Sequence, residues 1–372
     1  MADASRWAEE FASTRYRFMR LSRSTGLEVE QLRVVRGGTI TRNNDVRIME
    51  SAEVGLVGEL DLGPDLVRVH MDVTFRDGST ASEVLGTFVP AVPSRDVAGA
   101  YSTATMRLYG RLQELYDDRF PAPVVLPPGT NAVEAAARVC RECGLEVIAD
   151  GSSYVTTNQR TYGLGMERQN SDVGDTKLDM VNDLLGLAGF WAAKTDPWGR
   201  VIMRRYVAPE YREPVWSFVE GPDAKFEGAM TDEHDVTDAA NHVLVLYQTD
   251  KRSLVGEAWD HETELSVEAR GRVITRTYEY TSIPGGMTDA QLAEWANADA
   301  LRRLRTAQAT IRRVTLTHAY APLSIGDSVL VDYPTGGVSG KFEVRTQTLT
   351  LSGGCPTEAE LRQFNRRLKS DG

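Results

Sequence analysis

Cysteine and histidine are scarce in this chain, which holds three cysteines and five histidines among 372 residues. The three cysteines, Cys140, Cys143 and Cys355, are too few for a disulfide framework. No apolar run approaches the ~18 residues of a membrane-spanning helix, so we expect no membrane insertion by this chain. Residues 1–7 also lack an apolar signal segment, and we expect the protein to fold in a cytoplasm.

Positive charge is also in deficit. The chain has 42 Lys and Arg against 53 Asp and Glu, which gives a formal net charge of −11. Binding nucleic acid through its phosphates requires clustered positive charge, so the composition argues against a protein that holds DNA. The chain is otherwise ordinary, with 41% hydrophobic residues, and its length suggests two or three domains with cores of their own.

The first third of the chain has the alternation of β-strands. Residues 67–75 alternate between apolar and polar positions, the turn signal Asp77-Gly78 follows, and residues 85–89 form a second apolar run. Short strands at this spacing are typical of a barrel or sandwich. We therefore predict a first β-barrel domain with an N-terminal extension over residues 1–122.

A proline-rich stretch ending at Gly129 then separates this region from one with helical periodicity. Asn131 and Glu134 have the spacing of a helix N-terminus, and residues 176–187 show a second apolar helical stripe. Residues 190–206 read as a hairpin around Pro197. These signals predict a small α+β domain over residues 123–212.

The last third returns to β-strand patterns around one long helix. A strand is expected at 241–245, a helix at about 288–307 and further strands at 314–318 and after Gly326. We predict a second β-barrel domain, 213–354, with this helix inserted between its strands. For the C-terminal tail, 355–372, we predict a short helix that begins at Thr357 and carries Leu361, Phe364 and Leu368 on one side. The fold class is thus mainly β with α+β, two tube-type barrels flanking the α+β domain.

Few residues have the spacing of a chemical site. Cys140 and Cys143 form a C-x₂-C pair, but a zinc site needs about four ligands, and buried thiols are the favoured interpretation over metal binding or redox activity. His261-Glu262 begins like a zinc-peptidase helix, yet position 265 is leucine rather than histidine. An exposed loop or strand edge is the better interpretation.

Two further clusters are weak candidates for a site, because each lacks a residue that the corresponding motif requires. The acidic residues near Asp232 lack the ligand order and central glycine of a calcium loop, which favours a solvated acidic face; they are Asp232, Glu233, His234, Asp235 and Asp238. Gly163-Leu164-Gly165-Met166 has arginine where a phosphate loop needs its third glycine. The five histidines are scattered: His70, His234, His242, His261 and His318. We therefore predict no catalytic, cofactor-binding or metal-binding residues and no enzymatic activity.

The densest basic run is Arg302, Arg303, Arg305, Arg312 and Arg313. Its first three members fall near the end of the expected helix, where positive charge is favourable. A solvated helix end and a charged seam against a neighbouring subunit are both compatible with this run.

The order of several short motifs resembles one known family. The motifs are 46–51 (VRIMES), 85–89 (LGTFV), 104–112 (ATMRLYGRL), 176–185 (TKLDMVNDLL), 198–201 (WGRV), 241–245 (NHVLV), 325–329 (IGDSV) and 351–354 (LSGG). In this order, over about residues 15–354, the chain resembles the baseplate hub and minor tail proteins of long-tailed bacteriophages, most closely those of siphophages that infect actinobacteria. The family usually has Pro-Gly-Asp where this chain has Ile325-Gly326-Asp327, a departure confined to one turn.

The resemblance implies a homotrimer in which two barrels per chain form a pseudo-sixfold ring at the phage tail tip. It also implies as partners a distal tail protein or tail tube ring, the tape-measure protein and tip fibre or spike proteins, with DNA passing the lumen without specific binding. Two alternatives stay open from the sequence. One is a tail-associated peptidoglycan hydrolase whose site is built from scattered carboxylates and histidines, and the other is a receptor-binding tip module.

Overall fold

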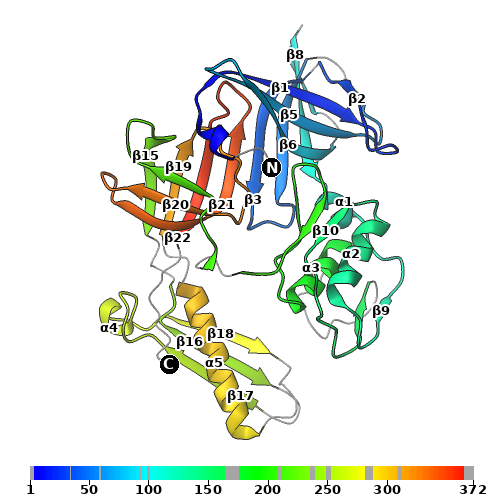
Figure 1. The fold of residues 1–372 in the computed structure, drawn as a ribbon. Helices are drawn as coiled ribbons and strands as arrows, with labels where there is room; N and C mark the ends of the chain where they lie inside the picture. Colours follow the sequence, from blue (N-terminus) through cyan, green and yellow to red (C-terminus); the bar gives the residue numbers. More distant parts are fainter. Residues whose placement is uncertain are drawn as a thin grey trace. The chain divides into compact units, whose positions relative to one another are not determined.

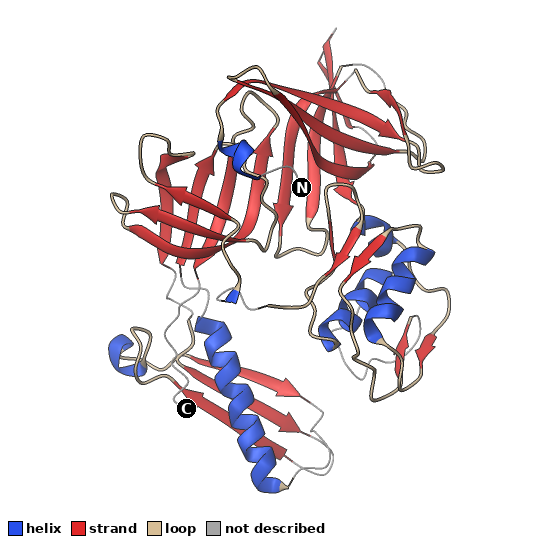
Figure 2. Cartoon of the chain, viewed as in Figure 1, coloured by secondary structure: helices blue, strands red, loops and turns tan. Residues whose placement is uncertain are grey.

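The structure is a computed structural model, and it describes residues 4–33, 35–57, 60–91, 94–98, 101–163, 176–207, 211–234, 239–248, 253–280, 288–308 and 312–363. The chain divides into two compact units, which are described separately. The first comprises residues 1–208, 318–325 and 346–358, and the second comprises 209–317, 326–345 and 359–372. Both are mainly β, with a few helices (Figure 2), as predicted.

The first unit contains one large antiparallel sheet (Figure 1). Its strands are β1 (Phe11–Leu21), β2 (Glu28–Gln31), β3 (Val35–Asn43), β4 (Glu50–Leu56), β5 (Leu66–Phe75), β6 (Thr80–Pro90), β7 (Ser94–Ala98) and β8 (Tyr101–Gly110). They lie in the order β3-β4-β8-β6-β5-β1-β2, with β7 paired to β8. The last part of β21 (Val338–Thr350), residues 346–350, pairs with β3, and a short 3-10 helix, η1 (Ala4–Ala8), precedes β1.

Alternation along the strands creates the core of this sheet. Met71, Val73 and Phe75 of β5 lie two residues apart and are buried, while Asp72 between them is half-buried and pairs with Arg17. Every second side chain of a strand points to the same face, so one face collects the apolar residues. The expected strand at 67–75 is thus confirmed.

The sheet curls until its two sides meet. The hydroxyl of Tyr16 on β1 donates to the carbonyl of Ser352 at 2.7 Å, and the amide of Gly354 donates to the hydroxyl of Thr14 at 3.1 Å. Among the described residues, these side-chain contacts join β1 to the chain after β21, and no strand ladder does. The barrel expected here is therefore a curled sheet that is not closed by backbone pairing.

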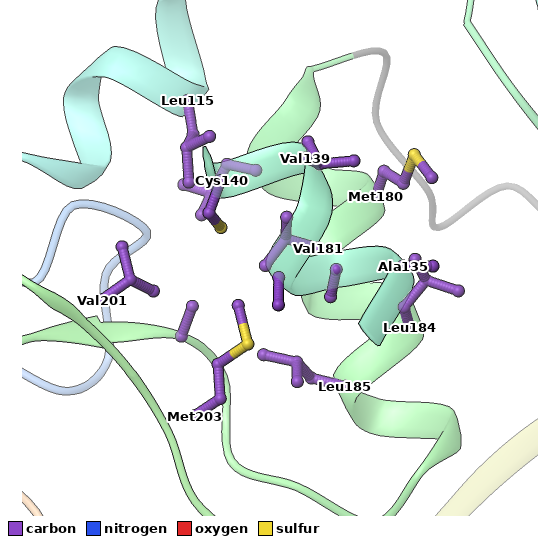
Figure 3. Close-up of a cluster of buried hydrophobic side chains, with 14 of the residues drawn as sticks. Leu115, Ala135, Val139, Cys140, Met180, Val181, Leu184, Leu185, Val201 and Met203 are labelled. Carbon is purple, nitrogen blue, oxygen red and sulfur yellow. The ribbon is translucent and has the colours of Figure 1, made fainter. Parts of the chain in front are cut away.

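An α+β layer completes the first unit. Its elements are α1 (Leu112–Asp117), β9 (Val124–Leu126), α2 (Ala132–Glu142), β10 (Val147–Ala149), β11 (Arg160–Tyr162), α3 (Lys177–Leu187), β12 (Lys194–Thr195) and β13 (Val201–Met203). β10, β13 and β12 form one sheet, and β9 pairs with β11. Figure 3 shows the core between α2, α3 and β13, where Cys140, Val181 and Met203 converge. Leu115 of α1 joins this core, so α1 packs with the α+β layer although it precedes residue 123.

Local sequence signals fix both helices. The side chain of Asn131 accepts a hydrogen bond from the amide of Glu134 at 3.0 Å, as the spacing predicts. Thr176 and Asp179 form a reciprocal capping box at the start of α3. Such caps satisfy amides that the first helical turn leaves without a partner.

The hairpin β12–β13 docks on the large sheet through buried polar contacts. Thr195 donates to the carboxylate of Glu50 at 2.7 Å, and both residues are buried. At the turn, the hydroxyl of Thr87 donates to the carbonyl of Pro197 at 2.9 Å, and the guanidinium of Arg68 stacks over the Trp198 ring at 4.9 Å. These contacts tie the hairpin to β4, β5 and β6.

The second unit contains another curled sheet. Its strands are β14 (Trp216–Val219), β15 (Phe226–His234), β19 (Arg312–His318), β20 (Ser328–Tyr333), the first part of β21 and the larger part of β22 (Thr357–Gln363). The order is β15-β19-β22-β21-β20-β14. The rings of Phe218 and Phe226, from the two outermost strands, meet edge to face at 6.2 Å. Apolar packing thus draws the edges together where the described strands show no ladder.

A small α/β layer lies between β15 and β19 in the chain. Its central strand β16 (His242–Gln248) is antiparallel to β17 (Ser253–Trp259) and parallel to β18 (Thr275–Tyr280). A one-turn helix, α4 (Val267–Arg270), connects β17 to β18, and the long helix α5 (Asp289–Gln308) lies across the sheet (Figure 1). The expected helix forms, and so does the strand expected at 241–245. Both belong to this three-stranded layer, because β16 pairs with β17 and β18 and not with the barrel-like sheet.

The C-terminal prediction was wrong where the structure describes it. Thr357 begins strand β22, not a helix, and its hydroxyl donates back to the carbonyl of Cys355. Thr357, Ala359 and Leu361 alternate as buried residues, which is a strand pattern. Phe364 and Leu368, on which the helical interpretation relied, lie outside the described residues. None of the helices in the described part of the chain is long and apolar enough to cross a membrane.

Candidate functional site

The C-x₂-C pair lies at the end of α2. Cys140 is buried in the α+β core as predicted, and burial raises the pKa of its thiol to about 12. Cys143, at the C-cap, lies 3.5 Å from the ammonium of Lys177, which also pairs with Asp118 at 2.5 Å. Burial raises the pKa of the Cys143 thiol as well. Both cysteines are therefore held as thiols, the form that binds metals and attacks electrophiles poorly.

The His261-Glu262 motif belongs to a structured loop after β17. Asp260 is buried and accepts hydrogen bonds from the amides of Glu262 and Thr263, both at 3.0 Å. The amide of Gln308, the last residue of α5, donates to the same carboxylate at 2.8 Å. His261 itself is exposed and pairs with Glu268 at 2.8 Å. The loop ties α5 to the sheet, which is a structural task.

Members of the acidic cluster and of the basic run form ion pairs, one of which joins the two groups. Asp232 of β15 forms a bidentate ion pair with Arg312 of β19 at 2.7 and 2.9 Å. Arg303 bonds the buried carboxylate of Asp299 at 2.9 Å, and Arg302 bonds the same carboxylate. Asp235 and Asp238, like Gly165 and Met166 of the glycine motif, lie outside the described residues. Within the described ranges, no three potential ligands are grouped as a metal site requires.

The histidines with described side chains each have a separate environment. His70 pairs with Glu28 at 2.7 Å, and His318 is buried, with its Nδ1 donating to the carbonyl of Ala319 at 2.6 Å. Burial lowers the pKa of His318 to about 4. The imidazole of His70 is thus bonded to a carboxylate and that of His318 to a backbone carbonyl.

One constellation escaped the sequence analysis. On the face of the small sheet opposite α5, the Nδ1 of His242 lies 2.8 Å from the hydroxyl of Thr275, and its Nε2 lies 3.0 Å from Glu257. The indole of Trp259 stacks on the imidazole, with ring centroids 3.7 Å apart and 15° between the planes. His242 is buried beneath Trp259, whose own side chain is 40% exposed.

This arrangement follows from strand register. His242 lies opposite Trp259 on β17 and opposite Thr275 on β18, so three residues far apart in sequence share one face. The order hydroxyl, imidazole, carboxylate has the form of a hydrolytic triad. The covering indole screens the imidazole from a substrate, however, so the geometry favours a binding face over a catalytic centre. The signal in the sequence was the alternation of Val255, Glu257 and Trp259 with small residues.

Comparison with known proteins gives the fold. No family model and no curated protein matches the sequence. Among solved structures, the tail protein from Neisseria meningitidis MC58 superposes with a TM-score of 0.65 and 15% identity over 94% of this chain and 96% of that chain. The 43 kDa tail protein of prophage MuSo2 from Shewanella oneidensis gives a TM-score of 0.64 and 12% identity over 93% and 95%.

A third solved structure is also similar. Prophage tail protein gp18 from Listeria monocytogenes EGD-e gives a TM-score of 0.53 and 14% identity over 94% of this chain and 95% of that chain. The matches extend over nearly the whole of both chains, so they include the curled sheets and the α+β parts together. The chain therefore has the fold of phage tail proteins.

Proposed function

We propose that this chain is a structural protein of a phage tail, acting as a hub at the tail tip. The observation that carries the proposal is the match to the Neisseria and Shewanella tail proteins over more than nine-tenths of each chain. The order of short motifs described above supports the narrower assignment to the hub and minor tail proteins of siphophages, including those of actinobacteria.

The proposed assembly is a homotrimer. Each chain supplies two curled sheets, so three chains supply six similar bodies around a threefold axis. Such a pseudo-sixfold ring joins a sixfold tube to a threefold tip, because the same six bodies satisfy both symmetries. The proposed neighbours are the distal tail protein or tube ring, the tape-measure protein and the tip fibre or spike.

Charge is consistent with passage of DNA through this ring. A chain of net charge −11 gives a trimer of 3 × (−11) = −33. An acidic body attracts no phosphate backbone and releases no counterions on contact with it, so DNA would move through without being held. The role that we propose is structural and involves no catalysis.

The mass of the assembled protein in solution tests the proposal. Light scattering of the purified full chain should give three times the monomer mass of 41.1 kDa, and gold-labelled antibody should mark the tail tip of intact particles. A monomer recovered from intact tails would contradict the trimer. Release of fragments from purified actinobacterial cell wall would favour a hydrolase, and binding of the isolated protein to host cells would favour a receptor-binding module.

A further inference from the structure

One face of the small sheet β16–β18 carries apolar side chains that no described element covers. α5 packs on the other face, where it buries Val243, Val245 and Tyr247. On the uncovered face, Leu244 and Leu246 of the central strand are only half-buried. The large side chains of the neighbouring strand β17 are more open, Val255 at 51% and Trp259 at 40%.

Two carboxylates border this apolar strip. Register places Glu257 of β17 beside Leu244 and Glu279 of β18 beside Leu246, and both glutamates are exposed. No Lys or Arg shares their face within the described strands, because Arg276 alternates to the side of α5. The face thus combines a central apolar strip with two negative charges, and it suits a basic segment with apolar anchors.

The last described strand ends at the end of its sheet where the chain also enters from the small layer. Gln363 ends β22 beside the start of β21, where its side-chain amide lies 3.5 Å from the carbonyl of Ser339. Arg312, the first residue of β19, bonds the carbonyl of Gly337 at that same end of the sheet. Three residues, 309–311, separate Arg312 from Gln308 of α5, so these two residues are at most about 14 Å apart.

Gln308 in turn marks the end of the small layer that carries His242 and Trp259. Its side-chain amide donates to the carbonyl of Ala240 at 3.0 Å and to Asp260 at 2.8 Å. Ala240 precedes β16 and Asp260 follows β17, so Trp259 lies at the end of the small layer from which the chain continues to β19. Nine residues, 364–372, follow Gln363 and could span about 30 Å if extended.

The sequence of these nine residues has the matching chemistry. It reads FNRRLKSDG, with Phe364 and Leu368 as its two large apolar residues and three cations, Arg366, Arg367 and Lys369, against one acid. We propose that residues 364–372 dock in cis on the uncovered face of β16–β18, with Phe364 and Leu368 against the apolar strip and the cations beside Glu257 and Glu279. The inference concerns a contact within one chain and does not rest on the proposed function.

A zero-length carbodiimide cross-link tests this docking in the native full chain. The reagent joins an amine to a carboxylate in direct contact, and peptide mass then identifies the pair. We expect Lys369 to be linked to Glu257 or Glu279. The F364S/L368S double variant keeps Lys369 but loses both apolar anchors, so this cross-link should fall at least about tenfold. The Lys177–Asp118 ion pair at 2.5 Å serves as an internal reference whose yield should not change.

Mixing isotopically labelled and unlabelled protein separates a contact within one chain from a contact between copies. Cross-linked peptides that combine a labelled and an unlabelled half would show docking between chains and overturn the proposal. It would equally be overturned if Lys369 were linked to neither glutamate, or if the yield were the same in the double variant. In an E257K/E279K variant the cross-link to Lys369 should be lost. Adding K369E to that variant should restore a cross-link between an amine and a carboxylate, which would confirm that the tail docks on this face.

Discussion

Gly256 of β17 lies directly against Ala296 of α5, so close that a methyl group at position 256 would overlap the carbonyl oxygen of Ala296. The neighbouring amide of Glu257 donates to the side chain of Asn297 at 3.0 Å. A helix can approach a strand this closely only where the strand has no Cβ. The seam fixes α5 on its sheet and leaves the opposite face of that sheet open.

Gly256→Ala should therefore loosen α5 from the sheet. The overlap involves backbone and cannot be relieved by a side-chain rotation, so we expect a loss of about 1–3 kcal/mol in the stability of the small layer. Hydrogen exchange of the β16 and β17 amides measures this loss locally. Gly186→Ala in α3 is the matched control, because a methyl group there meets no atom within 4 Å and should stabilise that helix by about 0.5–1 kcal/mol. Unchanged exchange in Gly256→Ala would show that α5 is further from β17 than described.

Asp299 interrupts the apolar side of α5, and the structure explains how it is accommodated. Its buried carboxylate accepts hydrogen bonds from the Tyr247 hydroxyl at 2.5 Å, from Arg303 at 2.9 Å and from Arg302. Asp299→Asn keeps the size but removes the charge that balances Arg303. We expect a loss of about 2 kcal/mol, below the ~3–5 kcal/mol of a fully buried pair because Arg303 is partly exposed. Arg305→Ala, on an exposed position of the same helix end, should change stability by less than about 0.5 kcal/mol.

The same carboxylate has a defined pH dependence. Burial alone raises the pKa of Asp299, but the hydrogen bonds from Tyr247, Arg303 and Arg302 lower it overall. An acid with a lowered pKa in the folded state stabilises the fold above its unfolded pKa of about 3.9, and loses that contribution as pH falls through the folded pKa. Exchange at β16 should thus accelerate below about pH 4 in the wild type, and less so in Asp299→Asn. Equal acceleration in both proteins would remove Asp299 as the cause.

Thr195 is the polar anchor of the docked hairpin, since its hydroxyl bonds the buried carboxylate of Glu50. Thr195→Val keeps the shape but leaves Glu50 without that donor, which should cost about 1–3 kcal/mol. Proteolysis within the β12–β13 hairpin measures its opening. Thr195→Ser retains the hydroxyl and should stay close to the wild type. Equal proteolysis of the Val and Ser variants would show that the hairpin docks through other contacts.

The helix N-termini could be predicted from sequence, because they depend on residues that are close together in the chain. The caps at Asn131 and Thr176 are set by a side chain and an amide three residues later, and both helices begin there as predicted. The helix predicted from Thr357 onward was wrong, because the position of Leu361 fits a helical and an alternating pattern equally well over so short a segment. Pairing with neighbouring strands decides between the two, and those partners come from elsewhere in the chain.

The candidate face was not predictable for a related reason. His242, Trp259 and Thr275 form one surface only because of strand register between segments separated by a loop and a helix. The alternation of Val255, Glu257 and Trp259 indicates a strand, but it does not say which strands lie beside it. The strand at 241–245 could be identified from its own alternation, but its assignment to the barrel required knowing its partners, which alternation does not encode.

His318 gives the last prediction, a loss of stability in mild acid. Burial lowers the pKa of its imidazole to about 4, whereas an unfolded chain titrates near 6.5. The unfolded state therefore binds more protons between these values, and stability falls as pH drops through that window. The loss amounts to about 2 kcal/mol between pH 7 and pH 5. His318→Asn, whose side-chain amide can replace Nδ1 as donor to Ala319, does not titrate and should lack this part of the loss. Hydrogen exchange of β19, the strand that ends at His318, at the two pH values measures it. An undiminished loss in His318→Asn would mean that the imidazole is solvated or charged in the folded protein.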